Sequence, residues 1–342
     1  MPPRSCASHH ERAGVHPTSV PPASPLPLMQ KRWFLGLVAT LVLYLGLSFW
    51  FGFADVMRSL AALPWWCWGL VAALVALGYL LLFQRWQFYL RQLGHPLPWR
   101  PSCRIYAAGL ALVAAPGRSG EALRGLWLQR RHGIPMQVGV GVTLAERVTD
   151  LAGALLVLAW GLGGRVLPAL VAGGGTLAIG AWLLTHPAAL RRLEAFLDRL
   201  PAHRRWRGLT RLLREALGAV GRLRRLLRPW PLLVGTALAA LVWLIEAAAL
   251  MGLLQMLGDP LALTQAAVIR TAMALGGVLS FLPAGVGTAE ATAIGLAVAF
   301  GVDRAAALAV TLVLRVCTVL LPTAVGVLVL ARQGNDGEGV GA

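Results

Sequence analysis

Long stretches without charge set the first constraint on how this chain can fold. Trp33 to Ala54, Leu60 to Gln84 and Val166 to Leu190 contain no Asp, Glu, Lys or Arg, and each is long enough to cross a bilayer, which takes roughly 20 apolar residues. Only 13% of all residues are charged, against about a quarter in soluble domains. This pattern predicts an all-α polytopic membrane protein, because helices satisfy their own backbone hydrogen bonds in lipid.

Two kinds of apolar region can be distinguished along the chain. Full spans are predicted at 32–53, 65–88, 137–161, 165–185, 230–257 and 303–331. Two other regions, 102–132 and 264–301, are interrupted by proline and glycine. Each is predicted to form a hairpin of two helical pieces, re-entrant or fully crossing, for about eight or more helices in all. Non-helical backbone at membrane depth survives only beside protein or a water-filled cavity.

The two interrupted regions resemble each other, which predicts an internal repeat. The recurring residues are, in order, Arg104, Pro116, Glu121, Gly133 and Arg147 in the first copy and Arg270, Pro283, Glu290, Gly301 and Arg315 in the second. Counting the spans places the two hairpins on opposite faces of the membrane. Inverted repeats with broken helices meeting near the midplane are an architecture of transporters.

The net charge of +17 comes mostly from arginine, much of it between Arg191 and Arg228. Arginine-rich loops of membrane proteins lie in the cytoplasm, where they meet anionic headgroups. Segment 186–229 is therefore predicted to be amphipathic and to lie on the cytoplasmic face of a bacterial-type inner membrane, with both termini also cytoplasmic. Binding to nucleic acid is not expected, because no module for it is recognisable.

The remaining features point to one membrane domain over 30–332. Residues 1–29 are rich in proline and serine, so they are predicted to be a disordered tail or to precede a true start at Met29; residues 333–342 are predicted to be a second disordered tail. The four cysteines are scattered without a CxxC pair. Neither a metal site, a cofactor nor a disulfide framework is therefore expected.

Ionisable side chains at membrane depth are candidates for function, because each is costly there unless paired or hydrated. They are Arg118, Glu121, Arg124, Glu146, Arg147, Asp150, Glu246, Arg270, Glu290 and Arg315. Five acids and five arginines suggest mutual pairing. Glu146 and Asp150 share a helix face and would repel unless an arginine lies between them or one is protonated. The alternative to a substrate site is a set of buried ion pairs that only fix helix register.

The stretch FLPAGVGTAEA at 281–291 is the most specific candidate. Its residues Pro283, Gly285, Gly287 and Glu290 lie where a helix would restart after a break. Backbone N–H groups at such a point attract an anion such as phosphate. In the alternative interpretation, Glu290 is one half of a buried pair with an arginine.

These motifs resemble those of the flippase-like integral membrane family, the transmembrane region of lysylphosphatidylglycerol synthases. The matching stretches are PGRSGEALR at 116–124, ERVTD at 146–150 and LPAGVGTAEA at 282–291. The family signature Pro-Gly-Gly-x-Gly-x-x-Glu is met by Pro283, Gly285, Gly287 and Glu290, with Ala284 in place of the first glycine. The resemblance covers 30–332 and implies lipid translocation without the aminoacyltransferase domain, for which the chain leaves no room.

Three functions are compatible with these features. The first is a lipid flippase or scramblase, in which arginines between the repeats hold the phosphate of an anionic or lipid-linked substrate. The second is a non-transporting subunit that docks a soluble lipid-modifying aminoacyl- or glycosyltransferase through 186–229, and the third is an ion-coupled transporter of a small anion. No catalytic residues are expected, because nucleotide-binding, metalloprotease and serine-hydrolase motifs are missing from the sequence.

Overall fold

The computed structural model describes residues 53–111, 113, 123–164, 207–280 and 282–338, and the single residues 168, 186, 188, 191, 192 and 195. All of them belong to the unit that begins at Val42. The described residues do not include the N-terminal tail, nearly all of the spans predicted at 32–53 and 165–185, most of 186–206, or Arg118 and Glu121.

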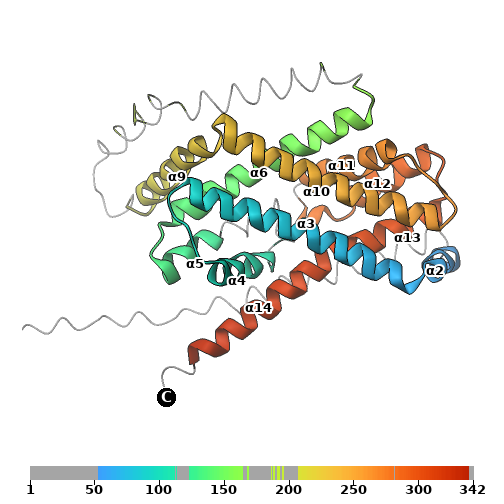
Figure 1. The fold of residues 1–342 in the computed structure, drawn as a ribbon, viewed down its shortest axis with the longest axis horizontal. Helices are drawn as coiled ribbons and strands as arrows, with labels where there is room; N and C mark the ends of the chain where they lie inside the picture. The colour runs from blue at the N-terminus through green and yellow to red at the C-terminus, as the bar shows by residue number, and fades with distance from the viewer. Residues whose placement is uncertain are drawn as a thin grey trace, which may run out of the picture. The chain divides into compact units, whose positions relative to one another are not determined.

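The described part of the chain is helical and contains no strand (Figure 1). Its helices are α2 (Phe53–Ala62), α3 (Trp65–Gln92), α4 (Trp99–Leu110), α5 (Leu123–His132), α6 (Met136–Gly161), α9 (Arg207–Leu226), α10 (Pro229–Met256), α11 (Leu263–Leu279), α12 (Thr288–Ala299), α13 (Arg304–Arg315) and α14 (Leu321–Glu338). Helices α3 and α10 and the segment Arg304–Arg332 are long and apolar enough to cross a membrane. The prediction of an all-α polytopic membrane protein is confirmed.

The second interrupted region is a pair of short helices, as predicted. Helix α11 has 17 residues and α12 has 12, so each is shorter than the roughly 20 residues of a span. A 3-10 turn at Pro283–Gly285 separates them. The first region likewise gives the short helices α4 and α5, but the break between them falls outside the described residues.

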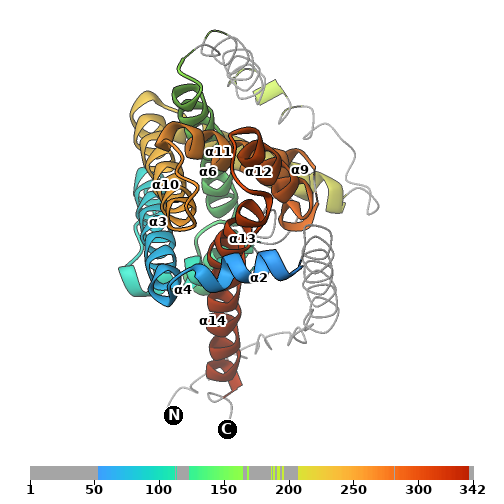
Figure 2. The same ribbon diagram turned by 90° about the vertical axis from the view of Figure 1, so that its right-hand side faces the viewer.

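The span predicted at 303–331 is not one regular helix. Helix α13 continues through a π-helical turn at Val316–Leu320 into α14 (Figure 2). The amide of Leu321 donates to the carbonyl of Val316, five residues back instead of four. Pro322 lies next to this turn and has no amide to give to a regular helix, which is the sequence signal for the interruption.

The internal repeat is visible in the helices and begins earlier than the sequence markers suggested. Helix α3, which starts at Trp65, has its counterpart in α10, which starts at Pro229, and both have 28 residues. Both end in the same turn: the amide of His95 donates to Leu90 O at 2.9 Å, and the amide of Asp259 donates to Leu254 O at 3.1 Å. These residues are related by the same offset in residue number as the two helix starts. The sequence LGHPLP at 93–98 thus recurs as LGDPLA at 257–262.

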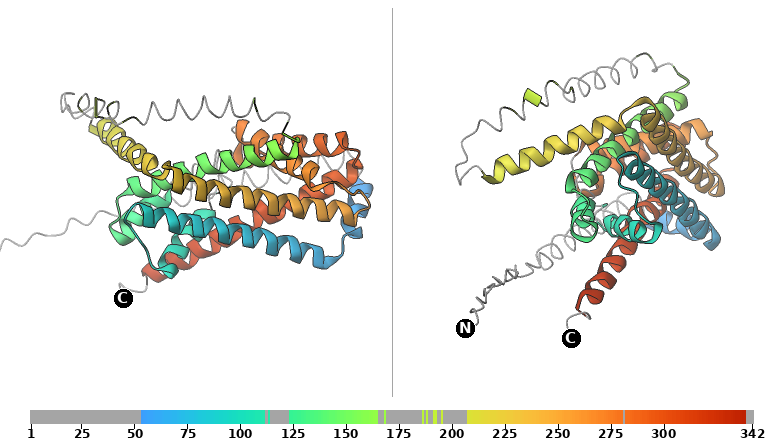
Figure 3. Two further views of the ribbon diagram at one scale, coloured as in Figure 1. Left: turned by 45° about the horizontal axis from the view of Figure 1, so that its top comes forward. Right: turned by 60° about the vertical axis from the view of Figure 1, so that its left-hand side comes forward.

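The packing of the helices follows the same repeat. Helices α3 and α10 pack on each other; α6 packs on α11 as α14 packs on α4; and α6 packs on α9 as α13 packs on α2. This set of contacts is unchanged when α2–α6 and α9–α14 exchange places, which defines a pseudo-twofold axis. Helices α3 and α10 lie side by side and run in opposite directions, so the two copies are inverted (Figures 1 and 3).

Exposed tryptophans mark both ends of the antiparallel pair. Trp65 and Trp66 begin α3, and Trp230 begins α10 at the opposite end; their exposed fractions are 85%, 44% and 63%. Tryptophan collects where the bilayer meets water. A helix of 28 residues is about 42 Å long, which exceeds the roughly 30 Å hydrocarbon core. The axes of α3 and α10 therefore cross the membrane.

Candidate functional site

The charged residues predicted at membrane depth form ion pairs wherever the structure describes them. These residues are Arg124, Glu146, Arg147, Asp150, Glu246, Arg270, Glu290 and Arg315. They do not gather at one place. They form four clusters, each between different helices, and two of these border the cavity described below.

The first cluster joins α5 to α6 through Arg124 and Glu146. Both residues are buried, and Arg124 Nη2 lies 3.2 Å from Glu146 Oε2. The guanidinium lies between two aromatic rings, 5.0 Å from the ring centre of Trp86 and 4.9 Å from that of Tyr106. Gly109 leaves room for this side chain, because a Cβ there would lie 2.8 Å from Arg124 Cγ and Cδ. The cluster combines an ion pair with two cation–π contacts.

The second cluster explains how two acids of one helix face coexist. Asp150 pairs with Arg147 of its own helix at 3.1 Å and with Arg85 of α3, whose Nη1 lies 2.7 Å from Asp150 Oδ1. Arg85 Nη1 also donates to Thr149 Oγ1 at 3.1 Å. Glu146 and Asp150 therefore have separate arginine partners, so neither needs to be protonated to relieve repulsion.

Arg85 is a site residue that the sequence did not reveal. It lies near the end of the span predicted at 65–88 and was not among the candidate residues. The side chain of Arg85 is only 1% exposed. Its neighbours Phe83 and Trp86 are also buried, and an apolar setting in the sequence was the available signal.

The third cluster holds the loop that follows α11. The amide of Gly287 donates to Glu290 Oε2 at 2.6 Å, and Arg315 Nε donates to Glu290 Oε1 at 2.5 Å. Arg315 Nη2 also donates to the carbonyl of Ala284 at 2.7 Å. Glu290 is completely buried. The geometry matches the interpretation of Glu290 as half of a buried pair, and the Gly287 amide expected to face a phosphate is bonded to Glu290.

Backbone shape explains the glycines of this loop. Gly285 and Gly287 have φ values of 65° and 90°, which side chains with a Cβ rarely adopt. A Cβ on Gly285 would also lie 2.5 Å from Gly277 Cα of α11. Ala284, which replaces the first glycine of the family signature, has a φ of 53° and is the one non-glycine residue with positive φ in the described chain. Pro283 begins the turn.

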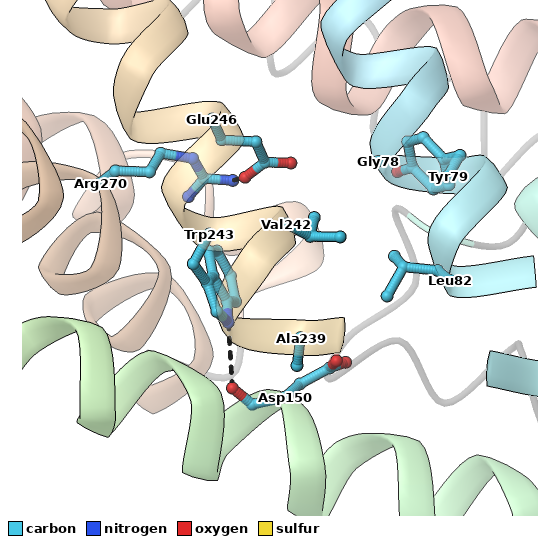
Figure 4. Close-up of a pocket in the computed structure, with 9 residues that line it drawn as sticks. All are labelled: Gly78, Tyr79, Leu82, Asp150, Ala239, Val242, Trp243, Glu246 and Arg270. Atoms are coloured by element: carbon cyan, nitrogen blue, oxygen red, sulfur yellow. Dashed lines mark hydrogen bonds and ion pairs between the residues drawn. The ribbon is translucent and has the colours of Figure 1, made fainter. Parts of the chain in front are cut away.

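The fourth cluster borders a cavity between α3 and α10 (Figure 4). Arg270 of α11 pairs with Glu246 of α10, and its guanidinium lies 4.9 Å from the ring centre of Trp243. The cavity is lined by Gly78, Tyr79, Leu82, Asp150, Ala239, Val242, Trp243, Glu246 and Arg270. The carboxylates of Asp150 and Glu246 both point into it. Its volume of about 30 Å³ holds about two water molecules and no lipid headgroup.

The cavity lies on the pseudo-twofold axis. The offset in residue number that relates Trp65 of α3 to Pro229 of α10 also relates three pairs of residues that line the cavity. These pairs are Gly78 and Val242, Tyr79 and Trp243, and Leu82 and Glu246. Gly78 also lies against Val242, since a Cβ there would be 3.3 Å from Val242 Cγ1. The two central helices thus meet at equivalent points, with a polar space between them.

The sequence-predicted site residues fall into three groups. Asp150 and Arg270 line the cavity, and Arg147 contacts it through Asp150. Arg124 with Glu146, and Gly285, Gly287 and Glu290 with Arg315, form clusters that do not line it. Arg118 and Glu121 lie outside the described residues. Glu246, a candidate both for function and for a buried ion pair, lines the cavity and pairs with Arg270, and Tyr79 and Trp243 were not anticipated.

Comparison with known proteins is consistent with this architecture. The family described as Lysylphosphatidylglycerol synthase TM region matches residues 33–326. The chain is also similar to a UPF0104 membrane protein of Methanothermobacter thermautotrophicus (strain Delta H), with 28% identity over 316 residues, which cover 87% of this chain and 92% of the relative. No solved structure matches the chain.

Proposed function

Since this chain belongs to the lysylphosphatidylglycerol synthase TM region family, we propose that it moves lipids with anionic headgroups between the leaflets of the membrane. The observation that carries the proposal is the charged cavity on the axis between two inverted copies. Transporters built from inverted repeats bind their substrates near the midplane, where the copies meet. Charges within a membrane mark the path of a polar substrate.

The mechanism follows from the pairing of the cavity arginine. With α3 and α10 in contact, the cavity is too small for a headgroup, so a headgroup enters when these helices part. Arg270 then exchanges the carboxylate of Glu246 for the lipid phosphate, a charge-assisted bond of the same kind. The acyl chains remain in the bilayer. Return of Glu246 to Arg270 releases the phosphate, so Arg270 has an anionic partner at each stage, while the displaced carboxylate of Glu246 faces the opened cavity and its water.

Removing the cavity ion pair is expected to slow lipid movement by about tenfold or more, since a hydrogen bond to a charged group contributes about 1.5–3 kcal/mol. The variant is Glu246→Leu with Arg270→Met, which removes both charges together and places at 246 the residue type of its counterpart Leu82. The measurement is the rate at which a fluorescent anionic phospholipid becomes accessible to a quencher in liposomes containing the purified protein.

The control is a second buried pair that does not line the cavity, Glu290→Gln with Arg315→Met. Its translocation rate, compared at equal amounts of folded protein, is expected to stay near that of the unaltered chain. A chain that moves no lipid above the rate of protein-free liposomes would contradict the proposal. Retention of a soluble lipid-modifying enzyme by such a chain would favour the docking subunit, and uptake of inorganic phosphate would favour the small-anion transporter.

The orientation that we propose in the membrane is supported by the counterparts α2 and α9, which lie against equivalent helices at opposite ends of the antiparallel pair. Helix α9 exposes Arg214, Arg224 and Arg225, whereas α2 carries a paired Asp55 and Arg58. Positive charge favours the cytoplasmic side. We therefore place α9 in the cytoplasm, together with both termini, and α2 on the outer face of an inner membrane.

Labelling with a membrane-impermeant maleimide tests this orientation. In a variant without the native cysteines Cys6, Cys67, Cys103 and Cys317, the substitution Arg58→Cys is expected to give labelling in intact cells. The substitution Arg225→Cys is expected to give labelling only after permeabilisation. Both native side chains are exposed, so access to the reagent depends on membrane side alone. The opposite labelling pattern would reverse the assignment.

A further inference from the structure

Two aromatic side chains of the cavity make equivalent hydrogen bonds to the backbone of a neighbouring helix. The Tyr79 hydroxyl of α3 donates to the carbonyl of Thr318 at 3.0 Å, and Trp243 Nε1 of α10 donates to the carbonyl of Asp150 at 3.1 Å. The two donors occupy the same position in α3 and in α10, counted from the first residue of each helix. The two acceptors are likewise equally far from the starts of α6 and α13. Each bond therefore joins one repeat to the other at the twofold-related position.

The two bonds differ in what the receiving carbonyl would otherwise bind. In a regular helix a carbonyl accepts the amide four residues later. For Asp150 that residue is Ala154, within the continuous helix α6, so the Trp243 bond is an additional one. For Thr318 it is Pro322, which has no amide. The Tyr79 hydroxyl donates to the Thr318 carbonyl, for which the amide four residues later is missing.

We propose that Tyr79 is a positioning residue that replaces the donor lost at Pro322 and thereby sets the angle at which α14 leaves α13. The π-helical turn at Val316–Leu320 is the hinge, since such turns are points where a helix changes direction and are frequent at functional sites. The ring of Tyr79 lines the central cavity, so whatever enters the cavity acts on this bond. The state of the cavity is thus coupled to the direction of α14.

The helix that the hinge would move, α14, has a defined packing partner. Helix α14 packs on α4 of the other repeat, and Gly326 allows the approach, because a Cβ there would overlap the backbone of Ala111. A change in the angle at Thr318 therefore moves α14 against the first hairpin. Opening of the cavity is then accompanied by movement of one repeat against the other. This inference adds a moving part to the proposed function and does not depend on which substrate is carried.

A double-mutant cycle between Tyr79 and Pro322 tests the assignment. Tyr79→Phe removes the hydroxyl and keeps the ring, and Pro322→Ala restores an amide that can reach the Thr318 carbonyl. Spin labels at the exposed positions Leu328 on α14 and Leu233 on α10 report the hinge as a distance distribution in nanodiscs. Tyr79→Phe is expected to broaden or displace the distribution. In the Pro322→Ala background, Tyr79→Phe is expected to leave the distance distribution unaltered, because the amide of residue 322 then donates to the Thr318 carbonyl.

The matched control is Trp243→Phe, which removes the equivalent donor from a carbonyl that has Ala154 as partner, and it is expected to leave the hinge distance unchanged. If lipid movement is measured in parallel, Tyr79→Phe is expected to lower its rate about fivefold, as for one neutral hydrogen bond lost. A hinge distance unaffected by Tyr79→Phe, or affected equally with and without Pro322, overturns the proposal. The distance measurement tests the role of Tyr79 even if the protein moves no lipid.

Discussion

Replacing Arg315 by methionine is expected to lower the free energy of unfolding by about 3–5 kcal/mol, because the substitution leaves the carboxylate of Glu290 buried without its arginine. Glu290 is completely inaccessible to solvent, so water cannot take the place of the guanidinium. The change also removes the bond from Arg315 Nη2 to the Ala284 carbonyl, which holds a backbone segment of positive φ. The melting temperature of the purified protein in detergent measures the loss.

Two controls identify the cause. Adding Glu290→Gln to Arg315→Met removes the stranded charge, and a Gln side chain can still accept the Gly287 amide, so most of the stability is expected to return. Arg58→Met breaks an exposed pair with Asp55 and is expected to cost less than about 1 kcal/mol. If Arg315→Met melts like the unaltered protein but abolishes lipid movement, the loop is a substrate site, as the sequence interpretation held.

Gly139→Ala is expected to destabilise the protein by about 3 kcal/mol, at the upper end of the cost of overpacking. A Cβ on Gly139 of α6 would overlap Gly125 Cα of α5 and lie 2.7 Å from Gly125 N. Both neighbours are backbone atoms, so no side chain can rotate away. Helix α5 must then move off α6, which also draws Arg124, next to Gly125, away from Glu146.

Gly252→Ala in α10 is the matched control for this prediction. Among the described residues, no atom beyond the backbone of α10 itself and the two chain neighbours lies within 4 Å of the position its Cβ would occupy, so the change is expected to stabilise the helix by about 0.5–1 kcal/mol. Melting temperatures of the two variants, measured under identical conditions, are expected to shift in opposite directions. If the Gly139→Ala and Gly252→Ala proteins have the same melting temperature, α5 and α6 separate without cost and the prediction is wrong.

The helices that cross the membrane were predictable because hydrophobicity alone determines them. Predicted spans at 65–88 and 230–257 became α3 at Trp65–Gln92 and α10 at Pro229–Met256. The repeat was also predictable in outline, since Gly133 and Gly301 precede α6 and α13 at the same spacing. The register of the repeat within the hairpins was not predictable. The sequence markers related Arg104 to Arg270, but α4 and α11 start at the same offset as α3 and α10, so the counterpart of Arg270 is Tyr106. Arg104 is exposed.

The pairing of charges was predictable in kind but not in detail. An equal number of acids and arginines predicted ion pairs, but which arginine meets which acid depends on how helices distant in the sequence pack. Glu146 and Asp150 are one turn apart, yet their arginines come from α5 and α3. The Tyr79 and Trp243 bonds depend on the same tertiary arrangement. Only the missing amide of Pro322 was visible in the sequence in advance.

The location of the cavity on the symmetry axis has a consequence for the direction of the lipid movement proposed above. Two identical halves, related by an axis in the membrane plane, would have inward-facing and outward-facing states of equal energy. Here Leu82 stands opposite Glu246 and Gly78 opposite Val242, so the two states expose different groups to each leaflet. The energies of the two states are therefore free to differ, and the positions at which the two halves differ would decide which state is the more stable one.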